Sequence, residues 1–223
     1  MIELKDFQPP LVAILRGLVP EHARDTAQVL FDAGFRIVEV PLNRRGALYC
    51  IEAICEVAPE GALVGGGTML STRDVDDVHD AGGRLMVAPN CDADVMRRAN
   101  ERGMVVVPGV ATPTEAFNAL RWRATALKVF PADMVGQAGL KAFRSVLPAE
   151  TPLWPVGGVA PEHLAGWVAA GATGFGLGSQ LFNPDLPIDD VGRRARAFMA
   201  AWQATRTTAP PSARVPPAPV ATR

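Results

Sequence analysis

Short apolar segments alternate with amphipathic segments along most of the chain. The first apolar run, Leu-Val-Ala-Ile-Leu at 11–15, is followed by an amphipathic stretch that begins at Pro20 and closes at an Ala-Gly pair, 33–34. A proline near the start of a helix and a glycine just past its end are common helix boundaries. These two segments therefore predict a buried strand followed by a helix.

The same alternation repeats as far as residue 204. Apolar runs rich in β-branched residues predict further strands at 36–42, 62–66, 84–88, 104–108, 125–130, 152–156 and 174–178. Amphipathic stretches predict helices at about 46–57, 71–81, 92–102, 112–121, 138–146, 160–170 and 188–204. Near-continuous apolar strands are typical of a parallel sheet that is covered on both faces. Eight strands alternating with eight helices favour an α/β fold of the (β/α)8 TIM-barrel type, and a doubly wound open sheet is the alternative.

The composition changes near the end of the chain. We expect a single barrel domain over residues 1–204, which includes a short N-terminal segment before the first strand. Residues 205–223 are rich in Pro, Ala, Thr and Val and show no periodicity. Such a composition predicts a disordered tail that carries no catalytic group.

Charge and composition exclude several classes of function. The formal net charge of −1 gives no reason to expect a nucleic-acid or membrane partner. No run of eighteen apolar residues and no signal-peptide pattern is present. The cysteines and histidines show no spacing typical of a metal site; they are Cys50, Cys55, Cys91, His22, His79 and His163. We therefore expect a cytoplasmic protein that works without a metal or a cofactor.

Two ionisable residues stand inside predicted strands. Lys128 lies between Leu127 and Val129, and Glu39 lies between two valines. Burying either charge is costly unless it is paired or neutralised. Lys128 could be a nucleophilic amine that forms a Schiff base with a carbonyl, with Glu39 as its acid/base partner. The alternatives are a lysine that reaches to water and a structural ion pair of Glu39 with Lys128 or Arg16.

Glycine-rich segments follow the seventh and eighth predicted strands. They contain Gly157-Gly158 and Gly178-Ser179. In TIM barrels the active site is built at the C-terminal ends of the strands, and the loops after strands seven and eight commonly hold a phosphate. At other predicted strand ends, Arg16 could clamp a carboxylate or phosphate, or form a salt bridge at the barrel rim. Thr68, which follows three glycines, could donate a further hydrogen bond to the anion.

Seven short motifs at these strand ends resemble the KDPG/KHG aldolase family. They are Leu-Val-Ala-Ile-Leu-Arg-Gly (11–17), Val-Glu-Val-Pro-Leu-Asn (38–43), Val-Gly-Gly-Gly-Thr (64–68), Ala-Pro-Asn (88–90), Leu-Lys-Val-Phe-Pro (127–131), Val-Gly-Gly-Val (156–159) and Gly-Leu-Gly-Ser (176–179). The resemblance covers residues 9 to 204. It implies a class I aldolase barrel, usually a homotrimer, that splits a 2-keto-3-deoxy-6-phospho sugar acid into pyruvate and D-glyceraldehyde 3-phosphate.

The resemblance also implies roles for individual residues. Lys128 corresponds to the Schiff-base lysine and Glu39 to the acid/base residue. The residues that would bind substrate fall into two groups. Arg16 and Thr68 correspond to residues at the keto-acid end, and Gly157, Gly158, Gly178 and Ser179 to the phosphate cradle. Pro89 and Val156 each lie in one of the motifs, and we expect them to bind substrate as well.

Three positions bear on which C4 epimer of the sugar acid, the galactonate or the gluconate type, is the substrate. Gluconate-type members of the family typically have Glu-Val-Thr-Leu-Arg-Thr at the second strand and a threonine before the Gly-Gly pair of the seventh. Here Pro41 and Asn43 stand in place of the first threonine and the arginine of that motif, and Val156 stands in place of the threonine before the Gly-Gly pair. The resemblance thus implies a galactonate-type substrate and a role in galactonate or galactose catabolism. The gluconate-type aldolase, a phosphosugar isomerase or epimerase, and a catalytically silent sugar-phosphate binding protein are the alternatives.

Overall fold

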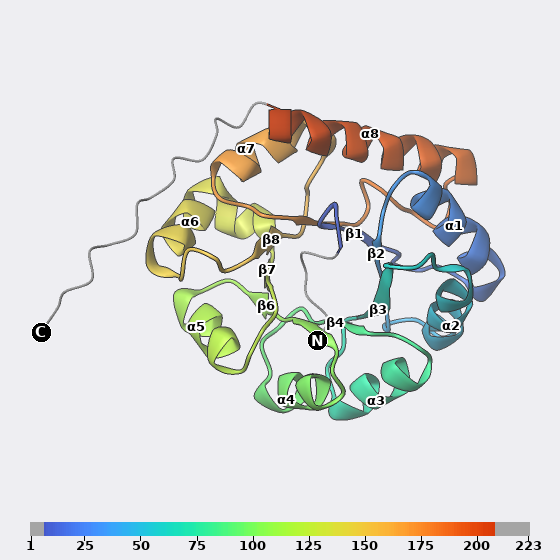
Figure 1. Cartoon of the computed structure of the whole chain (residues 1–223), viewed down its shortest axis with the longest axis horizontal. Helices are drawn as coiled ribbons and strands as arrows, with labels where there is room; N and C mark the ends of the chain where they lie inside the picture. The colour runs from blue at the N-terminus through green and yellow to red at the C-terminus, as the bar shows by residue number, and fades with distance from the viewer. Residues whose placement is uncertain (1–6, 208–223) are drawn as a thin grey trace, which may run out of the picture.

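Parallel strands lie at the centre of the molecule and helices surround them (Figure 1). The computed structural model describes residues 7–207. Its strands are β1 (Leu11–Ile14), β2 (Ile37–Pro41), β3 (Leu63–Gly67), β4 (Leu85–Val87), β5 (Val105–Val107), β6 (Gly109–Val110), β7 (Leu127–Val129), β8 (Leu153–Pro155) and β9 (Phe175–Leu177). Its helices are α1 (Pro20–Asp32), α2 (Ala47–Val57), α3 (Thr72–Asp80), α4 (Ala93–Glu101), α5 (Pro113–Arg121), α6 (Ala132–Val146), the 3-10 helix η2 (Pro161–His163), α7 (Leu164–Ala169) and α8 (Ile188–Thr207).

The strands form two parallel sheets. One has the order β5-β4-β3-β2-β1-β9 and the other the order β6-β7-β8. The predicted alternation of helices with parallel strands is therefore confirmed. The fifth predicted strand ends before Pro108, which has no backbone N–H for a sheet ladder. The predicted strand corresponds to β5, which pairs with β4, whereas β6 lies just beyond the predicted bounds and pairs with β7 in the other sheet.

The two faces of the strands pack into two separate apolar clusters. In β1, Leu11 and Ala13 join the larger cluster, which also contains the buried faces of the helices. Val12 and Ile14 join a smaller cluster that is built almost entirely from strand residues. Successive side chains of a strand point to opposite faces, so each strand contributes to both clusters. This arrangement explains why the strands read as near-continuous apolar runs in the sequence.

Two helix boundaries differ from the prediction. Helix α6 begins at Ala132 rather than near 138; Gly136 (φ 68°) has a non-helical conformation that divides α6 into two parts, and the predicted helix corresponds to the second part. Helix α8 continues to Thr207. Thr205 is buried and its hydroxyl donates a hydrogen bond to the carbonyl oxygen of Trp202, so the predicted tail does not begin at residue 205. The rest of that predicted tail, 208–223, and residues 1–6 lie outside the described residues.

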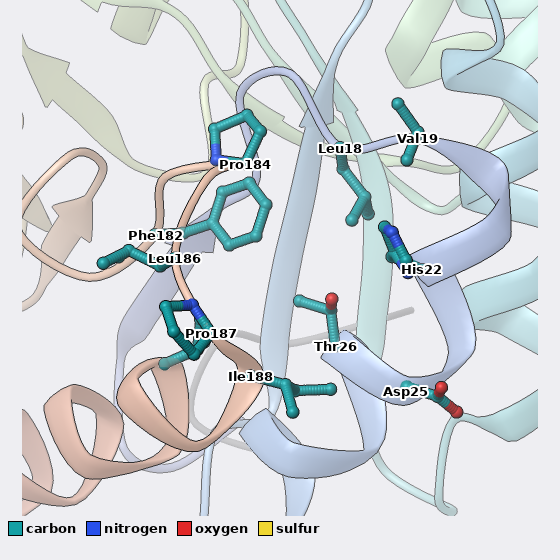
Figure 2. Close-up of a pocket in the computed structure, with 11 residues that line it drawn as sticks. Leu18, Val19, His22, Asp25, Thr26, Phe182, Pro184, Leu186, Pro187 and Ile188 are labelled. Atoms are coloured by element: carbon teal, nitrogen blue, oxygen red, sulfur yellow. The ribbon is translucent and has the colours of Figure 1, made fainter.

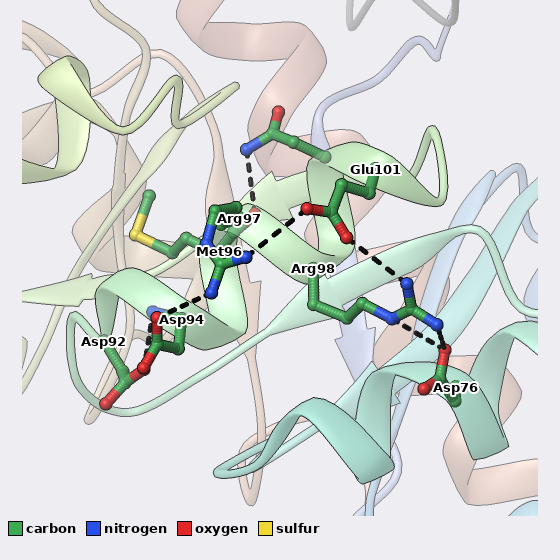
Figure 3. Close-up of polar contacts among 8 residues, drawn as sticks. Asp76, Asp92, Asp94, Met96, Arg97, Arg98 and Glu101 are labelled. Atoms are coloured by element: carbon green, nitrogen blue, oxygen red, sulfur yellow. Dashed lines mark hydrogen bonds and ion pairs between the residues drawn. The ribbon is translucent and has the colours of Figure 1, made fainter.

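A group of ion pairs joins two neighbouring helices (Figure 3). Asp76 on α3 accepts hydrogen bonds from Arg98 Nε on α4 at 3.0 Å and from Arg102 Nε, in the residue that caps the C-terminus of α4, at 2.7 Å. Arg98 also contacts Glu101, one turn further along α4. The hydrogen bonds from Arg98 and Arg102 lower the pKa of Asp76. These contacts fix the two helices that follow β3 and β4.

None of the helices in residues 7–207 combines the length and the apolar character that crossing a membrane requires.

Candidate active site

Lys128 and Glu39 share one buried cavity at the centre of the sheets. Glu39 follows Ile37 by two residues on β2, and Lys128 follows Ala126 by two residues at β7. Ile37 and Ala126 belong to the smaller, inner cluster, so the alternation of side chains along a strand turns Glu39 and Lys128 inward as well. Glu39 is only 2% exposed and Lys128 5%.

The cavity is small and mostly apolar. Besides Glu39 and Lys128 it is lined by Val12, Ile14, Val87, Val107, Trp154, Val156 and Gly176. The space within it that the centre of a water molecule can occupy is about 10 Å³. A single water molecule needs about that much room. The ion pairs found among residues 7–207 do not join Glu39 to Lys128 or to Arg16.

Burial shifts both groups toward their neutral forms. Desolvation raises the pKa of Glu39 above its ordinary value, and the positive charges of Lys128 and Arg16 oppose this shift. Desolvation lowers the pKa of Lys128; the charge of Glu39 opposes the shift and that of Arg16 adds to it. A neutral amine is a nucleophile, and a carboxyl group with a raised pKa is a stronger base than an ordinary carboxylate and can return the proton that it accepts. The site is therefore suited to attack on a carbonyl group.

Three neighbours shape the surroundings of this pair. The Lys128 ammonium nitrogen lies 5.0 Å from the centre of the Phe130 ring. Gly67 at the end of β3 has no side chain to displace the carboxylate: a Cβ there would lie 2.6 Å from Glu39 Oε1. Thr68 follows with φ 55°, a conformation that is uncommon outside glycine. Gly67, the last glycine before Thr68, thus makes space for Glu39.

Arg16 and Pro89 reach the site from two other strands. Arg16 follows β1 and is exposed, but it is close enough for its charge to affect the pKa values of both Glu39 and Lys128. The carbonyl group of Pro89, after β4, packs against Gly109, and Gly109 is the partner of Lys128 in the β6–β7 pairing. Any side chain on Gly109 would collide with Pro89, so this glycine allows the two loops to approach.

The two glycine-rich loops lie side by side. Val156 pairs with Gly176, so the loop that follows β8 and the loop that follows β9 leave adjacent strands at the same end. Gly157 (φ 116°) and Gly158 (φ 64°) both adopt left-handed conformations that favour glycine. Gly178 has open space where a side chain would be. Two loops with bare backbone N–H groups at one end of a parallel sheet form a surface that an anion could bind.

The predicted site residues therefore divide into two groups. Glu39, Lys128 and Val156 line the buried cavity. The others lie in loops at the C-terminal ends of the strands and do not line it; they are Arg16, Thr68, Pro89, Gly157, Gly158, Gly178 and Ser179.

The sequence reading missed the apolar wall of the cavity. Val12, Ile14, Val87, Val107 and Trp154 stand at alternate positions of their strands, which is the signal that could have identified them. That signal was ambiguous, because the intervening residues of each strand are apolar too.

A larger groove lies outside the sheets, between α1 and the segment that leads into α8 (Figure 2). Its volume is about 340 Å³, and its lining includes Leu18, His22, Phe182 and Pro184. Neither Lys128 nor Glu39 lines it.

Within residues 7–207, no group of three or more His, Cys, Asp or Glu side chains is placed to hold a metal ion.

Comparison with known proteins gives relatives over nearly the whole chain. Residues 3–194 match the family model described as KDPG and KHG aldolase. A probable 2-dehydro-3-deoxy-6-phosphogalactonate aldolase of Rhizobium meliloti is 45% identical over 203 residues, which are 91% of this chain and 96% of that protein. The 2-dehydro-3-deoxy-6-phosphogalactonate aldolase of Escherichia coli K12 is 43% identical over 194 residues, 87% of this chain and 95% of that protein. A solved structure described as native KDPGal is 42% identical, covers 90% of this chain and 97% of its own, and superposes with a TM-score of 0.88.

Proposed function

The chain belongs to the KDPG and KHG aldolase family, whose members are lyases, and on this basis we propose its substrate and the roles of its residues. The substrate is 2-dehydro-3-deoxy-6-phospho-D-galactonate, and the products are pyruvate and D-glyceraldehyde 3-phosphate. The observation that carries the mechanism is the single cavity in which Lys128 and Glu39 are buried together.

Lys128 is the nucleophile. Its unprotonated amine attacks the C2 ketone of the substrate, and the carbinolamine loses water to give an iminium ion. The iminium accepts the electron pair of the C3–C4 bond as that bond breaks, which leaves an enamine bound to Lys128. Protonation of the enamine at C3 and hydrolysis of the resulting imine release pyruvate and restore the amine.

Glu39 moves the protons. It removes the proton of the C4 hydroxyl, directly or through one water, as the C3–C4 bond breaks and the aldehyde leaves. It then returns a proton to C3 of the enamine. The raised pKa of Glu39, caused by its burial, suits both steps, because it makes the carboxyl group a better proton acceptor than an exposed glutamate while it can still return the proton.

The loops around the cavity bind the two ends of the substrate. Arg16 and Thr68 hold the carboxylate of the keto acid, and the Gly157-Gly158 and Gly178-Ser179 loops hold the phosphate. Pro89 and Val156 contact the carbon chain between them. Positive charge at Arg16 and the bare loops beside β8 and β9 support this assignment.

We propose that the two sheets form one closed (β/α)8 barrel in a single domain. Hydrogen bonds cross both seams between the sheets. At one seam Thr125 N donates to Val106 O at 2.8 Å, and at the other Thr173 N donates to Leu153 O at 3.0 Å. By likeness to its family we expect a cytoplasmic homotrimer that acts in galactonate or galactose catabolism.

The choice of epimer is tested by direct comparison of two substrates. The gluconate-type aldolase is the second candidate, because it uses the same chemistry with the opposite configuration at C4. Val156 lines the cavity where gluconate-type enzymes typically have threonine, and Pro41 and Asn43 likewise differ from them. Pyruvate release, measured with lactate dehydrogenase, should show a higher kcat/KM for the galactonate epimer. An equal or reversed preference would contradict the proposed substrate, and no pyruvate from either epimer would exclude both aldolases.

A further inference from the structure

An acidic side chain lies directly against the proposed phosphate loop. Asp133 stands in the first turn of α6, and its carboxylate occupies the position where a side chain on Gly158 would begin. Gly158 is one of the residues that we assign to the phosphate. A negative charge is the reverse of what a site built only for tight phosphate binding would place there.

The start of α6 is held close to this loop by the backbone. The Ala132 N–H donates a hydrogen bond to the Val156 carbonyl oxygen at 2.9 Å. The Ala132 nitrogen would also lie 3.4 Å from a Cβ on Gly157. The next N–H groups of α6 are bonded as well, since those of Met134 and Val135 donate to the Pro131 carbonyl oxygen at 3.1 and 3.2 Å. Asp133 follows Ala132 directly, so these contacts hold its carboxylate beside the loop.

The opposite side of the loop pair carries a cation. Arg194 on α8 donates hydrogen bonds to the carbonyl oxygens of Ser179 at 3.2 Å and Gln180 at 3.4 Å. The two loops are thus flanked by an arginine on the side of β9 and by an aspartate on the side of β8. Asp133, Gly158 and Ser179 are all exposed, so a phosphate held between the loops would meet both charges near the surface.

We propose that Asp133 is a specificity-determining residue that weakens the binding of the phosphate group. This inference rests on the proposed function, because it needs the Gly157-Gly158 and Gly178-Ser179 loops to hold the phosphate. The carboxylate lies against Gly158 and repels the phosphate dianion. D-Glyceraldehyde 3-phosphate therefore leaves the enzyme more readily, at the cost of a higher KM for the substrate.

The test compares Asp133→Asn with the wild-type enzyme, using inorganic phosphate as a competitive inhibitor. Asparagine keeps the size of the side chain and removes its charge. We expect the inhibition constant of phosphate and the KM of the phosphorylated substrate to fall by about three- to tenfold, the size of effect that a unit charge about 4 Å away has through water, to which Asp133 and both loops are exposed. The difference should shrink as salt screens the charges. The KM of an unphosphorylated 2-keto-3-deoxy acid should not change.

Two further variants separate charge from structure. Asp133→Glu retains the charge and should behave as the wild type does. Glu150→Gln makes the same change in net charge in the turn that precedes β8, at the opposite end of that strand, and should leave phosphate inhibition unchanged.

Each other outcome overturns the inference. If Asp133→Asn leaves phosphate inhibition unchanged or weakens it, Asp133 does not act by repulsion. If Asp133→Glu weakens phosphate binding as well, Asp133 supports the loop by its shape. If phosphate does not compete with substrate even in the wild-type enzyme, the proposed phosphate site fails and this inference fails with it.

Discussion

At the scale of single residues, the central feature is a lysine and a glutamate that are both desolvated. Either charge alone would be costly in the apolar cavity formed by the strands. Burial moves the pKa values of Lys128 and Glu39 toward each other, and the attraction between the two groups limits the shift. A pair of this kind costs stability and provides a reactive amine beside a proton carrier, which is common at functional sites.

Replacing Glu39 with glutamine should remove most of the activity. Proton transfer by a positioned group typically contributes about 10²–10⁴-fold to the rate, so kcat of Glu39→Gln should fall by that order. The amide is similar in size and carries no charge, so we expect the melting temperature not to fall. Steady-state kinetics and thermal unfolding measure both quantities, and a wild-type kcat would rule out the role assigned to Glu39.

The same variant makes a prediction about pH. The negative charge of Glu39 raises the pKa of Lys128, so its removal should lower that pKa further below the ordinary lysine value of 10.5. A lower pKa keeps the amine unprotonated to lower pH. Imine formation with pyruvate should therefore extend to lower pH in Glu39→Gln than in the wild type, as measured by borohydride trapping across a pH series. A midpoint shifted to higher pH would contradict the electrostatic coupling of the two residues.

The sequence identified these two residues because their neighbours are so apolar. A charged residue inside a Leu-Val or Val-Val context can be noticed without a structure, and so can glycine pairs at strand ends. Phe130 and Trp154 could not be identified in the same way. Their place beside Lys128 depends on which face of each strand turns inward, and both faces of these strands are apolar.

At the scale of elements, the packing of helix against helix depends on specific polar contacts. Asp76 on α3 pairs with Arg98 on α4 and with Arg102 at the C-terminal end of α4, and all three side chains are about a third exposed. Exposed ion pairs contribute little, but a carboxylate that binds two arginines at once loses less entropy for each contact than separate pairs do. The sequence could not show this contact, because it joins residues 22 and 26 positions apart on different helices.

Asp76→Asn should therefore lower the melting temperature by a few degrees at neutral pH. Asp77→Asn on the same helix is the matched control, because the ion pair that Asp77 forms within residues 7–207 is an exposed one with Arg73, and it should change the melting temperature less. The pKa of Asp76 is lowered from its ordinary value of 3.8, so its contribution is present above that pH and is lost as the pH falls below it. Thermal unfolding across pH checks this, and a difference between wild type and Asp76→Asn that grows toward low pH would contradict it.

Most elements were predictable, and the exceptions have local causes. The order of strands and helices followed from hydrophobic periodicity and from Ala-Gly or Arg-Gly pairs at helix ends. The predicted strand 104–108 instead ends at Val107, because Pro108 interrupts the ladder, and β6 begins beyond it at Gly109. The sequence pattern predicts only the second part of helix α6, which the non-helical Gly136 divides from the first.

At the scale of the whole molecule, parallel pairing brings together residues that are far apart in the chain. Glu39, Lys128 and Val156 come from three different strands and line one cavity. The C-terminal ends of parallel strands lie at one end of the fold, so the loops that carry Arg16, Thr68 and the glycine pairs gather around the same opening. Repetition of the strand-helix unit in the sequence predicted this gathering, but not the size or lining of the cavity.

The central claim is that Lys128 forms a covalent imine with pyruvate. Sodium borohydride reduces such an imine to a stable secondary amine, which intact mass measurement detects and peptide mapping locates. Lys128→Met, which places an apolar side chain of similar length in the buried site, and Lys141→Ala, which removes an exposed lysine of α6, are the paired variants. The account predicts a pyruvate adduct on Lys128 in the wild type and in Lys141→Ala, and none in folded Lys128→Met. An unmodified wild-type chain, or an adduct that persists in Lys128→Met, would contradict it.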